Sequence, residues 1–281
     1  FSDITKKDLE MILDEVITRP EIMKITKDSE GNEFAELSGS FAANAGITVR
    51  GTYQEDDSFH MDYYYPYVFG TSITTNEQID VEKHAEKESY AGVCDEVNLG
   101  VTLIFYIQNV ADYLAETNRH LSKIHYGAML AGLSTEGKIL CPVVERKKND
   151  VPAIQKNDRH NQLIAQAREG DEDAIESLTL EDMDTYALLS QRVMKEDIFS
   201  IVKSTFMPFG IESDQYTVLG EIIDCVTMEN KLTHEKLYGM KLLCNNIQFD
   251  VCINEKDLLG EPAIGRRFRG NVWMQGNLCL E

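Results

Sequence analysis

The chain has 281 residues, a formal net charge of −21, 43% hydrophobic residues and 27% charged residues. This is the composition of a globular protein, and the length exceeds the roughly 100–200 residues of one domain, so more than one domain is expected. The strong negative charge repels phosphates and therefore disfavours nonspecific binding to nucleic acids. No apolar run approaches the roughly 20 residues of a membrane-spanning helix, and the first residues do not resemble a signal peptide.

Residues 1–150 predict an α+β domain built on a mostly antiparallel sheet with flanking helices. Thr5 and Asp8 have the spacing of a capping box, and the apolar spacing after them predicts a helix over residues 6–18. Alternating apolar residues predict two hairpins, with strands at residues 22–27, 34–38, 47–53 and 59–65. The remaining expected elements are strands at residues 78–85 and 101–107, a short helix at 110–117, and a hairpin with its loop at 134–137.

Residues 151–215 predict an acidic helical connector. A charged break at residues 145–150 precedes it, and the apolar spacing then changes from strand-like to helical. Gly170 is placed as the residue that ends one of these helices. Residues 196–209 fit either a helix or a strand.

Residues 216–281 predict a small antiparallel β-barrel-like module. Residues 247–254 and 272–280 alternate between apolar and polar, as half-buried strands do. Apolar runs at residues 218–226 and 237–244 add two strands. Four or five short strands in about 65 residues favour a closed sheet, because closure removes exposed edges.

Three stretches, at residues 170–186, 197–222 and 260–276, together resemble an uncharacterised family of clostridial-type Gram-positive bacteria. The family is a domain of unknown function, and the resemblance covers essentially the whole chain. It implies a bacterial, cytosolic setting and a single evolutionary unit. It implies no activity, cofactor or catalytic residue.

The candidates for an anion- or partner-binding site lie in and just after the glycine-rich segment 260–270, and they are Arg266, Arg267, Arg269 and Trp273. Guanidinium groups on a rigid loop suit bidentate capture of a carboxylate or phosphate, and the indole adds a surface for stacking. The alternative is structural, with the arginines paired to Glu261, Asp257 or the acidic connector.

Residues 61–69 contain four tyrosines and a phenylalanine. Tyr64 and Tyr67 are the candidates for an exposed aromatic surface that meets a partner. The alternative is ordinary core packing, in which a tyrosine buries its ring and keeps its hydroxyl wet.

The expected outward faces of the N-terminal strands carry Arg50, His60, Asp62, Asp80, Glu82 and His84. If these strands were neighbours, the side chains would suit metal binding or acid–base chemistry. The alternative is a solvated face with cross-strand charge pairs. Neither a resident metal nor a cofactor is expected.

The sequence contains no phosphate-binding loop, dinucleotide fingerprint, HExxH, GxSxG or EF-hand motif. Six scattered cysteines are expected to be reduced structural thiols of a cytoplasmic protein. The favoured function is a non-catalytic binding or regulatory protein, whose partner is another protein or a second copy of this chain. No catalytic residue is assigned. An enzymatic function is disfavoured but remains an alternative.

Two alternative functions remain open. One is an enzyme that acts on a small anionic or carbohydrate-like substrate, which requires a cleft lined by His60, His84, carboxylates and arginine. The weaker one is single-stranded nucleic-acid binding by residues 216–281, which requires Trp273 on an exposed face beside the three arginines.

Overall fold

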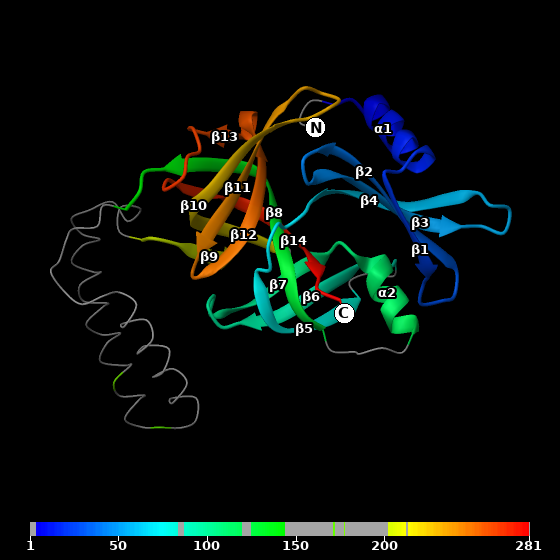
Figure 1. The fold of residues 1–281 in the computed structure, drawn as a ribbon, viewed down its shortest axis with the longest axis horizontal. Coiled ribbons are helices and arrows are strands. Elements are labelled where there is room, and N and C mark those ends of the chain that lie inside the picture. Colours follow the sequence, from blue (N-terminus) through cyan, green and yellow to red (C-terminus); the bar gives the residue numbers. More distant parts are fainter. Residues whose placement is uncertain are drawn as a thin grey trace. The chain divides into compact units, whose positions relative to one another are not determined.

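The computed structural model describes residues 4–83, 87–119, 125–143, 171, 177, 202–211 and 213–280. Residues 1–141 and 204–281 form one compact unit, and residues 142–203 form a second. The helices predicted for the acidic connector lie outside the described residues. The described part of the first unit is mostly β, with two sheets and two α-helices (Figure 1).

The first sheet has the strand order β1-β2-β3-β4 and is antiparallel throughout. Its elements are α1 (Lys6–Thr18), β1 (Ile22–Lys27), β2 (Glu33–Ala42), β3 (Ala45–Tyr53) and β4 (Phe59–Val68). Helix α1 buries Ile12, Leu13 and Val16 against apolar side chains of β2 and β3. The predicted first helix and both predicted hairpins are therefore confirmed.

The second sheet takes strands from both ends of the chain. Its elements are β5 (Thr75–Lys83), β6 (Tyr90–Glu96), β7 (Val101–Ile107), α2 (Val110–Asn118), β8 (His125–Leu140), β9 (Thr205–Pro208), β10 (Gln215–Glu229), β11 (Lys236–Cys244), β12 (Ile247–Asn254), the short 3₁₀ helix η1 (Glu255–Asp257), β13 (Leu258–Leu259) and β14 (Arg267–Leu278). Strand β14 pairs with β8 along almost its whole length. The segments 1–150 and 216–281, expected as separate domains, thus contribute to one sheet.

Two rings of strand pairs share β8 and β14. In one ring, β12, β11 and β10 connect β8 to β14, and in the other, β5, β6 and β7 connect the same two strands. One apolar core, which includes Phe105, Leu130, Phe249 and Phe268, draws its residues from both rings. The barrel predicted for residues 216–281 alone is not confirmed, because β8 supplies the strand between β12 and β14.

Two strand predictions differ from the structure. The hairpin expected around residues 134–137 is one continuous strand, β8, and Gly137 is a strand residue without a positive φ. Strand β6 is an element that the sequence does not predict. Its Gly92 lies under the ring of Phe105, where a Cβ atom would be 2.3 Å from the phenylalanine Cζ atom. Glycine at such a contact interrupts the alternation of apolar and polar residues by which strands are recognised in a sequence.

Helix α1 begins with the predicted capping box. The backbone N–H of Asp8 donates to Thr5 Oγ1 at 3.3 Å, and the backbone N–H of Thr5 donates to Asp8 Oδ2 at 3.0 Å. The carboxylate of Asp8 also accepts a hydrogen bond from the Thr5 hydroxyl at 2.7 Å, and this bond, followed by the one from the Thr5 backbone N–H, lowers the pKa of Asp8 below its usual value. No helix among the described residues is long and apolar enough to cross a membrane.

Replacing Thr5 with alanine is expected to lower the free energy of unfolding by about 1 kcal/mol, because an N-terminal N–H group of α1 loses its acceptor. Urea denaturation measures the change. Thr18→Ala, at the exposed end of the same helix, is the matched control and is expected to change stability by less than about 0.5 kcal/mol. Equal effects of the two substitutions would contradict a stabilising cap.

Candidate functional site

The three clustered arginines have different surroundings. Arg266 is exposed, and its Nη1 atom donates to the backbone oxygen of Glu261 at 2.7 Å. Arg267 is buried at the start of β14, and its Nε atom donates to the backbone oxygen of Cys141 at 2.9 Å. Burial lowers the pKa of Arg267. Of the three, Arg269 lines a cavity on the face of β8 and β14.

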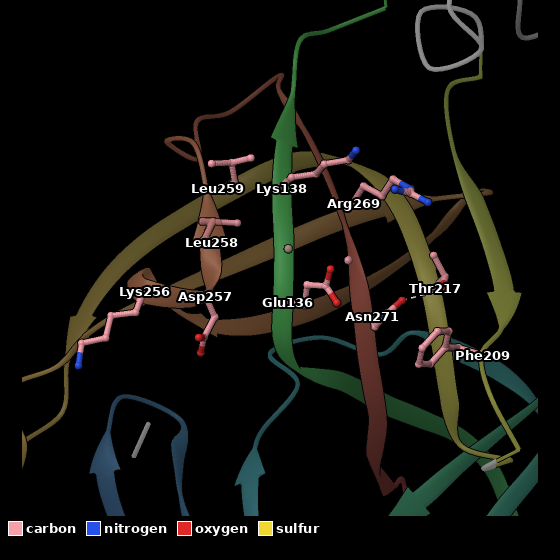
Figure 2. Close-up of a pocket in the computed structure, with 12 residues that line it drawn as sticks. Glu136, Lys138, Phe209, Thr217, Lys256, Asp257, Leu258, Leu259, Arg269 and Asn271 are labelled. Carbon is pink, nitrogen blue, oxygen red and sulfur yellow. Dashed lines mark hydrogen bonds between the residues drawn. The ribbon is translucent and has the colours of Figure 1, made fainter. Parts of the chain in front are cut away.

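This cavity has a volume of about 520 Å³. We call it the β8–β14 cavity. It is lined by Glu136, Gly137, Lys138, Phe209, Thr217, Lys256, Asp257, Leu258, Leu259, Arg269, Gly270 and Asn271. Figure 2 shows that β8 and β14 cross its middle, with η1 and β13 on one side and β10 on the other. Segments far apart in the sequence therefore build one site.

Two positively charged side chains lie beside each other on the cavity's two central strands. Lys138 of β8 is directly opposite Arg269 of β14 in the antiparallel pairing. Figure 2 shows the two side chains beside each other on the cavity side of the sheet. Lysine ammonium and arginine guanidinium groups both donate charge-assisted hydrogen bonds to anions.

Polar side chains next to this pair are held in place. Asn271 is opposite Glu136, two residues along the same two strands from Arg269 and Lys138. The Oγ1 atom of Thr217 donates to the side-chain oxygen of Asn271 at 2.7 Å. Glu136 is the diagonal neighbour of Arg269 and offsets part of its charge. The cavity lining therefore combines the adjacent positive groups of Lys138 and Arg269 with two carboxylates, those of Glu136 and Asp257.

Exposed apolar side chains accompany these charges. Leu259 is 75% exposed and Phe209 is 42% exposed, and both line the cavity. Lys256 extends away from Lys138 and Arg269 in Figure 2, and its Nζ atom lies 3.8 Å from Glu235 Oε1. Exposed apolar groups beside polar ones are typical of surfaces that bind other molecules.

Trp273 belongs to a different environment. Its Nε1 atom donates to Asp214 Oδ2 at 2.7 Å, and its ring lies 5.3 Å from that of Tyr106 and 6.5 Å from that of Tyr65. The indole is half-buried against tyrosines. The arrangement required for single-stranded nucleic-acid binding, with Trp273 exposed beside three arginines, is not the one in this structure.

Arg50, predicted to face solvent, is fully buried at 0% exposure. Its guanidinium forms an ion pair with Glu36, with an Nη2–Oε1 distance of 2.6 Å. It also donates to backbone oxygens of Ile107 and Gln108 at 3.1 and 2.8 Å, and to the hydroxyls of Tyr63, Tyr65 and Tyr106. The second carboxylate oxygen of Glu36 accepts the backbone N–H of Ala111 at the start of α2. This cluster connects the first sheet to β7 and α2.

The tyrosines are divided between surface and core. Tyr64 is 41% exposed, in agreement with the expectation of an accessible ring. Tyr67 is only 3% exposed, so its predicted exposure is wrong. Its ring stacks on Phe69 with a centroid distance of 4.3 Å, and burial raises the pKa of its hydroxyl to about 12.

The predicted face of histidines and carboxylates is divided between the sheets. His60 and Asp62 lie in β4 of the first sheet, whereas Asp80 and Glu82 lie in β5 of the second. His84 lies outside the described residues. Within the described ranges, no group of three or more histidine, cysteine, aspartate or glutamate side chains is placed to hold a metal ion. His60 does not line the β8–β14 cavity.

Three buried thiols are poor nucleophiles. Burial raises the pKa of Cys94 and Cys244 to about 12 and that of Cys252 to about 11. A thiol reacts as its thiolate, so these groups are protonated and unreactive near neutral pH. Their chemistry is that of core residues.

Glu136 and Lys138 are site residues that the sequence analysis misses. Reading residues 134–137 as a turn hides them, because the alternation of Glu136 and Lys138 with Gly137 and Ile139 then appears to be interrupted. Taken as a strand, the same residues predict two charged side chains on one face. Their position opposite β14 depends on a pairing partner more than a hundred residues away.

Comparisons with known proteins identify a family and no activity. The family model described as "Domain of unknown function, E. rectale Gene description (DUF3881)" matches residues 1–276. No curated protein and no solved structure matches the chain. The match agrees with the resemblance to an uncharacterised family over nearly the whole chain.

Proposed function

The chain belongs to the DUF3881 family, whose function is unknown, and from its geometry we propose that it is a non-catalytic binding protein. The β8–β14 cavity is its binding site, and the ligand is an acidic and apolar segment of another protein. The observation that carries this proposal is the juxtaposition of Lys138 and Arg269 in a chain with a net charge of −21. Carboxylates of the partner contact this pair, and its apolar side chains pack on Leu259 and Phe209.

Binding is favoured over catalysis by the chemistry of the cavity. Its lysine, arginine and amide groups donate hydrogen bonds to an anion, while the exposed apolar residues favour a macromolecular surface. Of the two histidines that the enzyme alternative requires, His60 lies in the first sheet and does not line the cavity, and His84 lies outside the described residues. The cytoplasm of a bacterium is the proposed setting, and the free state of all six cysteines supports it.

The probe for this function is a short fluorescein-labelled peptide in which glutamates alternate with leucines. Replacing both Lys138 and Arg269 with glutamine is expected to weaken its binding about tenfold, because two charge-assisted contacts are lost. Fluorescence anisotropy measures the dissociation constants. Raising the salt concentration is expected to weaken binding to the wild-type protein more than to this variant.

The matched control replaces Lys6 and Lys7, exposed on α1, with glutamine. It makes the same change in net charge and is expected to bind the peptide within twofold of wild type. Equal affinities of the two double variants would refute the site, and equal affinity for a lysine–leucine peptide would refute the acidic ligand. Sedimentation velocity tests the partner, because a dimer abolished by the Lys138 and Arg269 substitutions would identify a second copy of the chain.

A further inference from the structure

A second cavity lies where the first sheet meets β8, β11 and β12, and its volume is about 470 Å³. Phe41, Ala42 and Ala45, around the β2–β3 turn, line one part of it. Leu133 of β8 and Cys252 of β12 line another part. We call it the inter-sheet cavity. It shares Asp257 with the lining of the β8–β14 cavity and is otherwise built from different residues.

Small side chains create this space. Ala42, Ala45 and Cys252 belong to one buried cluster at the junction of the two sheets, where larger side chains would fill the gap. Gly46 is the next residue along β3 and also lines the cavity. A Cβ atom at Gly46 would lie 2.0 Å from the backbone oxygen of Gly39 and 2.7 Å from the hydroxyl of Tyr67, so the close approach of β2 to β3 requires glycine there.

The buried polar side chains of the lining are already used within the protein. Ser134 donates to the backbone oxygen of Asn271 at 2.7 Å. Asn230 accepts two backbone N–H groups from the turn that follows it. Asn254 accepts a backbone N–H of η1 and donates its amide to Glu235. Because these side chains already have hydrogen-bond partners within the protein, they do not require a charged or strongly polar ligand.

We propose that the inter-sheet cavity binds a small, uncharged, apolar molecule of the aliphatic or aromatic class. Its volume falls in the range of roughly 300–1,000 Å³ that small-molecule sites occupy, and its walls are mainly apolar, as in such sites. Burial of the ligand's surface drives binding. This inference does not depend on the β8–β14 cavity, whose lining is charged.

The probe for the inter-sheet cavity is N-phenyl-1-naphthylamine, an uncharged dye whose fluorescence rises in apolar surroundings. The chain of 281 residues is expected to bind one dye molecule, which 1-dodecanol displaces. Ala45→Leu, which puts three more carbons into the cavity, is expected to weaken dye binding at least tenfold. Ala43→Leu is the matched control, because Ala43 is exposed in the neighbouring turn, and it is expected to bind as wild type. Equal binding by both variants would overturn the proposal.

A second measurement uses the unmodified chain and decides the question if Ala45→Leu fails to fold. Cys252 lines the cavity, so a bound dye is expected to slow its modification by methyl methanethiosulfonate at least fivefold, as followed by peptide mass spectrometry. The reaction is run at pH 9, since burial raises the pKa of this thiol to about 11. Cys244, whose thiol donates to the backbone oxygen of Thr205 in the core, is the internal control. Equal labelling of Cys252 with and without dye would overturn the proposal.

Discussion

Replacing Arg50 with methionine is expected to lower the free energy of unfolding by about 3–5 kcal/mol, the usual cost of removing one partner of a buried ion pair. The substitution leaves the carboxylate of Glu36 buried without its counter-charge. It also removes the donor for the backbone oxygens of Ile107 and Gln108 and for three tyrosine hydroxyls. Urea denaturation followed by tryptophan fluorescence measures the loss, because Trp273 packs on Tyr106 of the same cluster.

The guanidinium of Arg50 stays protonated in the folded protein, so its ion pair with Glu36 persists. Burial by itself lowers the pKa of a guanidinium, but the electrostatic influence of the Tyr65 hydroxyl and the Glu36 carboxylate, followed by the hydroxyls of Tyr106 and Tyr63, outweighs burial here. The net result is a pKa raised well above the usual value. Arg50 therefore keeps its charge in the folded state at every pH at which the protein is handled.

Two further variants separate the ion pair from simple loss of packing. Arg19→Met, at the exposed end of α1, is the matched control and is expected to change stability by less than about 0.5 kcal/mol. Adding Glu36→Gln to Arg50→Met is expected to restore part of the lost stability, because it removes the unpaired buried charge. A loss below about 1 kcal/mol for Arg50→Met would contradict the role of this cluster in joining the first sheet to β7 and α2.

Arg50 also shows where sequence reasoning fails. In β3 the residues Ile47 and Val49 alternate with Thr48 and Arg50, so the sequence predicts a half-buried strand with Arg50 outside. In the structure both faces of that part of β3 are covered, one by α1 and the other by groups at the end of β7. A strand buried on both sides no longer separates apolar from polar by alternation. The partner Glu36 and the tyrosines become visible only when distant strands come together.

Sequence patterns predict an element correctly when the residues that determine it lie close together in the sequence. The capping box of α1 is complete within residues 5–8, and in the first half of β12 buried residues alternate with more exposed ones as predicted. In its second half the predicted outward side chains of Cys252 and Asn254 are buried too. Pairing between β14 and β8 is different, since it joins residues more than a hundred positions apart in the sequence. That strand pairing brings Lys138 and Arg269 together. The sequence predicts only Arg269 as a site residue, as one of three clustered arginines that have different surroundings in the structure.

Replacing Gly137 with alanine is expected to lower the free energy of unfolding by about 1–3 kcal/mol, the usual cost of overpacking a core. The added Cβ atom would lie 2.4 Å from Cε2 of Phe268, a fully buried ring on the paired strand β14. If Gly137 were instead a turn residue, as its sequence context predicts, the penalty would come from backbone conformation and would not depend on Phe268. Thermal and urea denaturation of the single and double variants distinguish the two causes.

Phe268→Leu alone is expected to cost about 1–2 kcal/mol through lost packing, and Gly137→Ala combined with Phe268→Leu is expected to cost less than the sum of the two. The smaller leucine makes room for the new methyl group, so the two substitutions are coupled. Gly239→Ala in β11 is the matched control, because its Cβ would meet the flexible end of Met228 and the side chain of Val226, both at 3.1 Å. It is expected to change stability by less than about 0.5 kcal/mol. Strict additivity at residues 137 and 268 would mean that the close approach of β8 and β14 is not what requires glycine.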